Sequence, residues 1–437
     1  MTAAPPRPTR RAMAMALIAA LLGWMFDGFE MGLFPLVARP ALLELMGPDA
    51  ARTIGTWLSA ILAVFLVGAA CGGILFGWLG DRIGRVRAMV WSVATYAVFS
   101  GLCGFATAPW HLAVLRFIAA LGMGGEWALG VALVMEIWPE KHRPMLAGFI
   151  GAASNVGFLL IALIGLGLAQ VVTELGDFLR AVRLPQEWVA ALLANSGWRV
   201  LLFVGAAPAL LTFFIRLFVP ESERWKHAAR GAPKNRVIDI FRGGLARPAA
   251  LGTLLAAIAL LGTWGSVQWI PSWADKLTGG EMPTAKSLAQ VWLSLGAILG
   301  CLVGAPFAQW TSRRIGYFAL CAGSLVACQY LFRVPMAFGT AYLAWIFAVG
   351  GLTAAFYAWL PLYLPELFPT RVRATGQGFA YNTGRVLTAV GVLVSGQLLN
   401  VFGENYARMC AVISLIYIVG LAFIWFCPET KGKPLPE

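Results

Sequence analysis

Long apolar stretches alternate with short polar ones along the whole chain. Most of the apolar stretches reach about 20 residues, the length that an α-helix needs to cross the hydrocarbon core of a bilayer. The pattern predicts twelve membrane-spanning helices, six in each half of the chain. Their approximate spans are 12–38, 54–80, 87–107, 110–135, 144–170, 198–219, 248–271, 286–310, 316–334, 340–364, 374–399 and 406–427.

Two polar segments interrupt this alternation. Residues 171–197 are amphipathic and mixed in charge, and we expect this insert to lie outside the cell, on or near the membrane surface. Residues 220–247 are polar and basic, which predicts a cytoplasmic linker. The predicted organisation is therefore an N-terminal six-helix bundle over 1–219, the linker, and a C-terminal six-helix bundle over 248–437.

Composition supports a polytopic, all-α membrane protein. The 437 residues are 59% hydrophobic and 12% charged, whereas about a quarter of a typical soluble domain is charged. The net charge of +13 comes from basic residues in short loops rather than on one face, which excludes nucleic-acid binding. Loops on the side of the two termini hold about 22 Lys and Arg against about 9 on the other side, so both termini are predicted to be cytoplasmic.

Enzyme chemistry has no support in the sequence. The seven cysteines lie in or at the end of apolar runs, and the three histidines lie at or beyond helix ends. Neither set has the spacing of metal ligands, and no phosphate-binding G-x-x-x-x-G-K-[ST] string occurs. We therefore expect no metal, no cofactor and no catalytic residue.

Three short signals recur at matching points of the two halves, which predicts two related six-helix bundles, a plan common among transporters. The string Glu136-x-x-Pro-x-x-x-Arg143 recurs as Glu366-x-x-Pro-x-x-x-Arg373. A Pro-Glu pair follows both the sixth and the twelfth predicted helix. The string GWLGDRIGRVR, residues 77–87, has a worn copy at 312–316, in which Arg313 is expected to replace Asp81.

These motifs resemble those of the major facilitator superfamily of transporters. Residues 77–85 match its G-x-L-x-D-R-x-G-R loop, and PESERW and PETKG resemble the sugar-porter branch. The string Asp27-Gly-Phe-Glu30 resembles the D-G-x-[DE] signature of aromatic-acid and sialic-acid proton symporters. The resemblance implies twelve helices in two pseudo-symmetric bundles and transport by alternating access.

Charged side chains within the spans are candidates for proton coupling, because a charge inside the membrane costs several kcal/mol and faces a partner or a water-filled cavity. Asp27 and Glu30 lie on one face of the first helix, and Arg116 lies in the fourth. In sugar-porter relatives the matching acid and arginine pair. We expect Asp27 to exchange a proton with Arg116 as its gating partner; the alternative is a fixed buried pair.

Arg385 in the eleventh span is the main candidate for substrate binding, because a guanidinium can hold a carboxylate through two parallel hydrogen bonds. The alternative is a structural bridge to Glu126 or another acid. Glu126 itself is expected to neutralise an arginine, with substrate binding or proton relay as alternatives. The further substrate candidates are Asn382, Tyr381, Gln268, Trp264 and Tyr357.

Charges at the cytoplasmic helix ends are predicted to form ion pairs that hold the inner side closed. Plain topology signals are the alternative, but they would not account for the acids. The predicted gate consists of Gly77, Asp81, Arg82, Arg85, Glu136, Arg143, Arg224, Arg314, Glu366 and Arg373.

The sequence thus predicts a monomeric secondary transporter of the plasma (inner) membrane that imports a small organic acid together with protons. The acid would be a sialic or other sugar acid, or an aromatic or short-chain carboxylate. Three alternatives stay open: a symporter or facilitator of neutral sugars, an exporter of drugs or metabolites, and a membrane sensor that does not transport.

Overall fold

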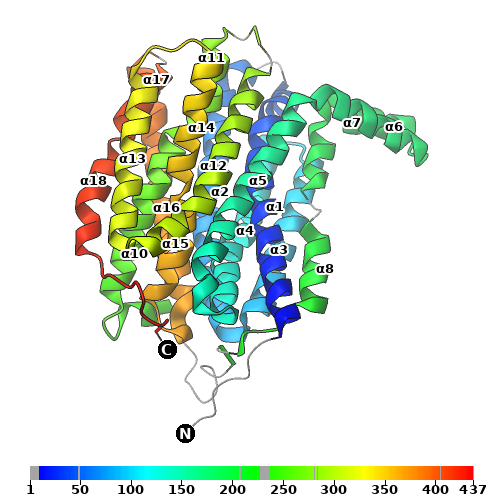
Figure 1. Ribbon diagram of the computed structural model, residues 1–437. Helices are drawn as coiled ribbons and strands as arrows, with labels where there is room; N and C mark the ends of the chain where they lie inside the picture. Colours follow the sequence, from blue (N-terminus) through cyan, green and yellow to red (C-terminus); the bar gives the residue numbers. More distant parts are fainter. Residues whose placement is uncertain are drawn as a thin grey trace.

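The computed structural model describes residues 9–47, 50–205, 208–223, 225–226, 237–279, 281–282, 284–403 and 405–436. Most of these residues lie in helices, and no strand occurs among them. The start of the first helix and the last described residues lie at the same end of the bundle, called the terminal end here (Figure 1). The other end is called the opposite end.

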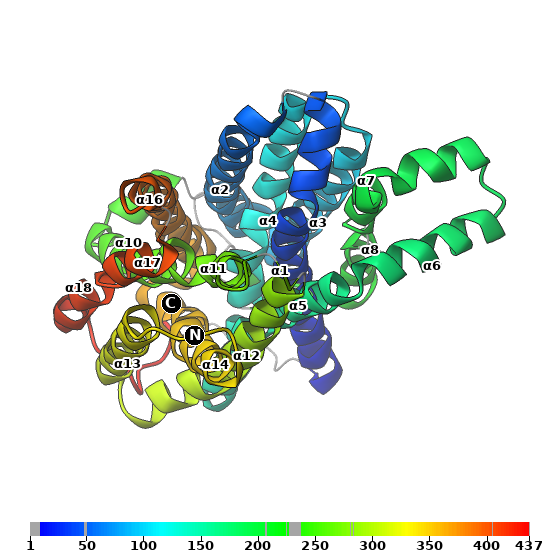
Figure 2. The same cartoon turned by 90° about the horizontal axis from the view of Figure 1, so that it is seen from above.

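The helices form two groups that lie side by side (Figure 2). The first helix group comprises α1 (Arg10–Met46), α2 (Ala50–Ile83), α3 (Arg85–Leu102), α4 (Pro109–Ile137), α5 (Arg143–Leu166), α6 (Leu168–Ala181), α7 (Gln186–Val204) and α8 (Pro208–Phe218). The second helix group comprises α10 (Ala246–Gly265), α11 (Ile270–Leu277), α12 (Ala285–Trp310), α13 (Arg313–Arg333), α14 (Thr340–Ala354), α15 (Phe356–Tyr363), α16 (Arg373–Val401), α17 (Tyr406–Ile413) and α18 (Ile416–Phe423).

Ten segments of the described chain are long and apolar enough to cross a membrane. The other two predicted spans are α16, which is long but less apolar, and the pair formed by the end of α7 and α8, on either side of residues 206–207. The helix bounds agree with the predicted spans within a few residues, except that α1 continues to Met46 through Pro35 and Pro40. The protein is therefore an all-α, multi-pass membrane protein with the expected twelve spans.

One span of the second helix group is broken. The helix α10 ends at Gly265, and a 3-10 turn, η5 (Val267–Trp269), joins it to α11. Ser266 at the break is fully buried and has a backbone φ of −125°. Broken helices of this kind carry the binding sites of many transporters, because the interruption exposes polar groups to an internal cavity.

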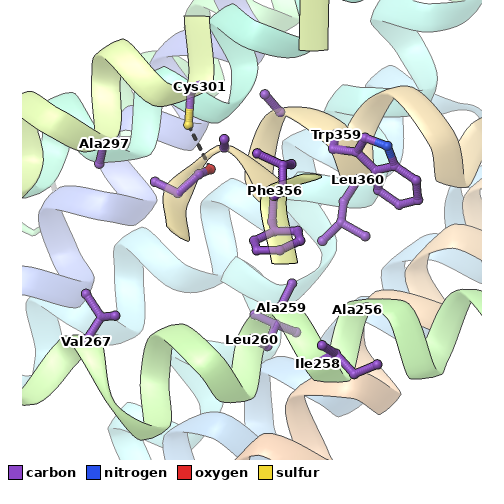
Figure 3. Packing of buried hydrophobic residues seen from close by; sticks show 14 of the residues in the cluster. Ala256, Ile258, Ala259, Leu260, Val267, Ala297, Cys301, Phe356, Trp359 and Leu360 are labelled. Carbon is purple, nitrogen blue, oxygen red and sulfur yellow. Dashed lines mark hydrogen bonds between the residues drawn. The ribbon is translucent and has the colours of Figure 1, made fainter. Parts of the chain in front are cut away.

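The core of the second helix group is apolar and tightly packed (Figure 3). Ile258 and Leu260 of α10 belong to one buried cluster with Phe356 and Trp359 of α15. Cys301 of α12 joins it and donates its thiol to the carbonyl of Ala354 at 3.1 Å. All seven cysteines are free thiols, six of them buried, which fits their expected role as small packing residues.

The helices α6 and α7 form a hairpin that projects sideways from the opposite end of the bundle (Figures 1 and 2). It contains the predicted insert, residues 171–197. Its base is fixed by Glu44 of α1, which accepts hydrogen bonds from the side chains of Asn195 (2.8 Å), Trp198 (2.7 Å) and Arg199 (2.8 Å). Arg199 also donates to the carbonyls of Gly104 and Ala106, so one cluster joins α7 to α1 and to the α3–α4 connection.

Replacing Glu44 by Ala is expected to destabilise the first helix group by about 1.5–3 kcal/mol, because the change removes charge-assisted hydrogen bonds from partly buried donors. The measurement is thermal unfolding in detergent. Glu174→Ala, on the exposed surface of α6, serves as control and should change stability by less than about 0.5 kcal/mol. Equal unfolding temperatures for Glu44→Ala and wild type would show that this cluster does not hold the hairpin.

Candidate functional site

The terminal end of the interface between the helix groups is closed by a buried charge network. Arg85, the first residue of α3, is fully buried and forms an ion pair with Asp81. It also donates to Glu136 Oε1 at 3.0 Å, to the carbonyl of Gly80 at 2.8 Å and to the carbonyl of Thr370 at 3.1 Å. Three of these four acceptors belong to the first helix group, and Thr370 belongs to the second.

The two acids of the network reach across to the start of α16. Asp81 accepts hydrogen bonds from the backbone amides of Ala374 (3.3 Å) and Thr375 (2.7 Å). A carboxylate in this position is stabilised by the unpaired amides and the dipole of the helix N-terminus. Glu136 accepts a hydrogen bond from Arg373 Nη1 at 3.2 Å. The predicted gate residues Asp81, Arg85, Glu136 and Arg373 therefore come together in one cluster.

Glycines allow the helix groups to approach closely on both sides of this cluster. A Cβ on Gly77 of α2 would lie 2.8 Å from the carbonyl oxygen of Ala374 on α16. A Cβ on Gly151 of α5 would lie 2.7 Å from the carbonyl oxygen of Tyr357 on α15. Real Cβ contacts are not this short, so a side chain at either position would hold the helices apart. Gly77 thus belongs to the closed layer.

The second helix group contains a matching cluster, and it corrects the sequence comparison. Arg313 pairs with Glu366 at 2.8 Å and donates to Gln309 at 2.7 Å and to the carbonyl of Ala308 at 3.3 Å. These contacts correspond to those of Arg85 with Glu136, Asp81 and Gly80. Gln309 therefore occupies the position that corresponds to Asp81. Arg313, which was expected there, lies one helical turn later and corresponds to Arg85.

The Pro-Glu motifs cap the helices that carry these arginines. Glu221 accepts from the backbone amides of Arg85 (2.9 Å) and Val86 (3.1 Å) at the start of α3. Glu429 accepts from the amides of Arg313 and Arg314 at the start of α13, both at 3.1 Å. Burial raises the pKa of Glu221 despite these bonds. Burial also tends to raise the pKa of Glu429. The amide donors outweigh this effect, so the pKa of Glu429 lies below its ordinary value.

The remaining predicted gate residues have other positions. Arg82 is exposed and stacks on Trp78, with its guanidinium 4.8 Å from the ring centroid. Arg143 pairs with Glu140 at 3.1 Å within the first helix group. Arg314 donates from its side chain to the carbonyl of Cys427 at 2.7 Å. Arg224 lies outside the described residues.

Arg116 has a different partner from the one expected. It forms a buried ion pair with Glu30, which also accepts from the hydroxyl of Ser100 at 3.1 Å. Its guanidinium lies over the rings of Phe34 (4.5 Å) and Phe65 (4.7 Å). Three residues along a helix move a side chain by about 4.5 Å and about 60° around the axis. Glu30 therefore reaches the level of Arg116, whereas Asp27 lies closer to the terminal end.

Asp27 instead faces the interface between the helix groups. It is fully buried, and its carboxylate receives no hydrogen bond from a donor among the described residues. Glu126 of α4 and Arg385 of α16 act on it electrostatically, together with Glu30. Glu126 lies against α1, because a Cβ on Gly23 would collide with its carboxyl oxygen. Glu126 forms no ion pair with the described arginines.

Arg385 projects into a cavity between the two helix groups. Its side chain donates to Asn382 Oδ1 at 3.2 Å, and its guanidinium lies 4.9 Å from the ring centroid of Tyr381. Tyr381 in turn stacks on Trp127 of α4, with ring centroids 4.0 Å apart. Within the described part of the chain Arg385 has no carboxylate at ion-pair distance. Its positive charge is therefore available to a ligand in the cavity.

The cavity is lined by neutral polar groups and aromatic rings in addition to Arg385. Five predicted substrate residues belong to the lining: Trp264, Gln268, Tyr357, Tyr381 and Arg385. Asn382 does not belong to the lining but accepts a hydrogen bond from Arg385. Glu126 also lies outside the lining. The arrangement suits a small organic anion, because one cation can bind a carboxylate while rings and amides contact the remainder.

Sequence reasoning missed the neutral polar residues of the cavity. They are Ser154, Asn155, Thr263, Gln290, Ser294 and Thr353. One available signal was a polar pair one turn apart in an apolar helix: Gln290 donates to Ser294 at 3.0 Å on α12. No group of His, Cys, Asp and Glu that could hold a metal ion was found among the described residues.

Comparison with known proteins gives consistent results over most of the chain. The model of a family described as Major Facilitator Superfamily matches residues 12–391. A probable 4-methylmuconolactone transporter of Cupriavidus pinatubonensis is 32% identical, covering 95% of this chain and 90% of the relative. A sialic acid transporter of Escherichia coli is 27% identical, covering 93% of each. The solved structure of a proton:xylose symporter superposes with a TM-score of 0.74 at 18% identity, covering 97% of this chain and 98% of the other.

Proposed function

Because the chain belongs to the Major Facilitator Superfamily, we propose that it imports a small organic anion together with a proton by alternating access. The family and the membrane-spanning helices identify it as a membrane transporter rather than an enzyme. The proposal adds the substrate class, the coupling ion and the direction of transport. Its site lies between the two helix groups, at the cavity beside Arg385.

The observation that carries the proposal is the position of Arg385. Arg385 is 5% exposed, lines the cavity and has no carboxylate at ion-pair distance among the described residues, so its guanidinium can pair with a ligand. A substrate carboxylate pairs with it through charge-assisted hydrogen bonds. Tyr381 and Asn382 hold the guanidinium in place, so little entropy is lost when the anion binds.

The names of the relatives support an acid over a neutral sugar. Both 4-methylmuconolactone and sialic acid carry a carboxyl group beside polar oxygen functions, and the two relatives are named for these compounds. The xylose symporter is 18% identical and speaks only for the fold. A neutral sugar would also form no ion pair with Arg385, so it would make no use of the one charged group among the described residues of the cavity lining.

Asp27 is the group that we assign to the proton. It is the buried acid on which Arg385 of the other helix group acts. A substrate carboxylate that occupies Arg385 weakens this action, and Asp27 then binds a proton more readily. Substrate and proton bind together in this scheme, which is the requirement for symport.

We place the protein in an inner membrane with its terminal end in the cytoplasm, because loops at that end hold the excess of Lys and Arg. The buried charge network therefore closes the transport pathway on the cytoplasmic side. Arg373, at the start of α16, lies 8 residues before Tyr381 and 12 residues before Arg385. The charge network is therefore about 12–18 Å along the helix from the residues beside the cavity. The described conformation is therefore the one in which the substrate is shielded from the cytoplasm.

Uptake by proteoliposomes tests the substrate class. The panel contains sialic acid and 4-methylmuconolactone, a methyl ester of each, and xylose as a neutral sugar. We expect one or both acids to be taken up and to compete with each other, whereas the esters and xylose compete at least about tenfold less well, a difference of about 1.4 kcal/mol. Equal transport of the esters or of xylose would contradict the assignment of Arg385 to a carboxylate.

A further inference from the structure

The segment that follows the twelfth span turns back toward the start of α16. Its residues 430–436 are called the tail here. Thr430 is buried, and its hydroxyl donates to Glu366 at 2.6 Å, which fixes the beginning of the tail on the second helix group. The amide of Lys433 donates to the carbonyl of Thr430 at 3.1 Å and closes a tight turn. Gly432 lies in this turn with a φ of +76°, a conformation that favours glycine.

Beyond the turn, the tail contacts two residues at the beginning of α16 and just before it. The carbonyl of Pro436 accepts a hydrogen bond from Arg373 Nη2 at 2.6 Å. The same carbonyl accepts from the amide of Thr370 at 3.2 Å and from its hydroxyl at 3.3 Å. Leu435, the residue before Pro436, is 6% exposed, so its buried side chain anchors this part of the tail. Three donors on two residues therefore hold one carbonyl of the tail.

Both of these residues also contact the first helix group. The carbonyl of Thr370 accepts a hydrogen bond from Arg85 at 3.1 Å, and Arg373 Nη1 donates to Glu136 at 3.2 Å. The described hydrogen bonds of the tail itself are with the second helix group. The tail therefore acts on the contact between the two groups through Thr370 and Arg373.

Loss of the tail would cost more in the closed conformation than in the open one. Arg373 is fully buried and Thr370 is 6% exposed, so without Pro436 their donors would stay buried and lose this acceptor. Buried donors without an acceptor are costly. Once the helix groups separate at the terminal end, water reaches these donors and replaces the acceptor. A contact shifts an equilibrium when its free energy differs between the two conformations, and this contact meets that condition.

We propose that the tail is a positioning element of the cytoplasmic gate and favours the conformation that is closed at the terminal end. The carbonyl of Pro436 orients Arg373 and Thr370 for their contacts with the first helix group, and it provides their buried donors with an acceptor. The inference rests on the closing role that the proposed function gives to the buried charge network. It adds to the gate a segment that the sequence-based prediction, which ended at Arg373, did not contain.

A substitution at Gly432 tests the turn without disturbing a neighbour. A Cβ at this position would have no described heavy atom within 4 Å beyond its chain neighbours, so a side chain acts through the backbone φ alone. Gly432→Val is strained at positive φ and should release the tail. Gly432→Asn is the matched control, because Asn tolerates this conformation. Gly403→Val makes the first exchange at another open glycine with positive φ, beyond the end of α16 at the opposite end.

A second pair of variants loosens the tail at its buried side chain. Leu435→Asn places a neutral amide where an apolar side chain is buried, which is unfavourable unless the amide finds hydrogen-bond partners. Leu435→Met keeps an apolar side chain of similar volume and is the control. Gly432 and Leu435 act by different mechanisms, backbone strain and burial, so the tail is the feature that both substitutions have in common.

The measurement is the rate at which a water-soluble maleimide labels the cysteine of Ala374→Cys, a fully buried position at the start of α16, in a protein without its native cysteines. Gly432→Val and Leu435→Asn should be labelled at least about threefold faster than the parent protein, because buried donors lose their acceptor in the closed conformation. Gly432→Asn, Leu435→Met and Gly403→Val should stay within about twofold of the parent protein.

Arg85→Ala in the same background separates this inference from the proposed function. Faster labelling in Arg85→Ala, with unchanged labelling in both Gly432→Val and Leu435→Asn, would overturn the role of the tail and leave the rest of the gate in place. Unchanged labelling in Arg85→Ala as well would overturn the closing role of the network, on which both accounts rest. A tail that only stabilises the fold would lower the unfolding temperature of its variants and leave the labelling of folded protein unchanged, which also contradicts the inference.

Discussion

Replacing Arg385 by Gln is expected to weaken binding of the transported acid by about 30-fold to 5,000-fold, which corresponds to about 2–5 kcal/mol for the loss of one partner of a buried charge pair. The substrate carboxylate would enter a cavity of neutral groups without a counter-charge. Lys at this position keeps the positive charge but lacks the planar guanidinium that can form two parallel hydrogen bonds. The affinity of Arg385→Lys for the acid should therefore lie between those of the wild type and Arg385→Gln. Binding of labelled sialic acid or 4-methylmuconolactone to purified protein measures the effect.

The matched control is Arg333→Gln, which makes the same exchange on the exposed end of α13. It should bind the acid as the wild type does. The methyl esters provide a second comparison, because their weak binding should change less than about threefold in Arg385→Gln. Unchanged affinity for the acid in this variant would place the substrate carboxylate elsewhere in the cavity.

Replacing Arg85 by Ala is expected to open the terminal end. The guanidinium bonds to Asp81, Glu136 and the carbonyl of Thr370, and its loss leaves two buried acids with one cation fewer. Breaking a buried pair in this way costs about 3–5 kcal/mol. The cost falls on the closed conformation, since the acids become hydrated when the helix groups separate. A change of this size shifts a two-state equilibrium by about two to four orders of magnitude.

The measurement is the labelling rate of one introduced cysteine in a cysteine-free background. Ala374, fully buried where α16 meets Asp81, is a suitable position. A water-soluble maleimide should react at least tenfold faster in Arg85→Ala and, to a smaller extent, in the milder Asp81→Asn. Arg87→Ala, at an exposed position in the first turn of α3, should leave the rate unchanged. Equal labelling in all variants would show that the network does not hold the gate closed.

The two charge clusters at the terminal end, one in each helix group, have similar contacts within their own group. They differ in their contacts with the other group. Glu136 of the first group is reached by Arg373 of the second. The equivalent Arg143 pairs with Glu140 of its own group, and Glu366 pairs with Arg313 of its own group. The acid of the first copy and the arginine of the second copy thus join the two groups, whereas the ion pairs of Arg143 and Glu366 described above each lie within one group.

Apolar length alone was sufficient to predict the spans, because each helix must satisfy its backbone hydrogen bonds internally within the membrane. The loop motif identified Asp81 and Arg85, and the repeated Glu-x-x-Pro-x-x-x-Arg string identified Glu136 and Arg373, since their spacing fixes them at helix ends. The start of α13 was harder. Two adjacent arginines stand there, and the cap formed by Ser312, whose hydroxyl accepts from the amide of Ile315, sets which one turns inward.

Partners across the bundle could not be predicted in the same way. Arg116 was expected to meet Asp27, but relative depth and rotation of α1 and α4 bring it to Glu30. The depth and rotation of α4 depend on how closely glycines such as Gly122 and Gly124 pack against α3 and α2. The sequence of one helix does not show this packing. The neutral cavity residues were missed for a related reason: Ser, Thr and Asn occur often in membrane helices, so their type alone does not mark a site.

The most direct test of the account is accumulation of sialic acid or 4-methylmuconolactone by proteoliposomes under an inward proton gradient, compared between wild type and Asp27→Asn. We predict that the wild type concentrates the acid above its external level, whereas Asp27→Asn exchanges it across the membrane without concentrating it. Accumulation by Asp27→Asn equal to that of the wild type, or wild-type uptake that ignores the gradient, would contradict proton-coupled import through Asp27.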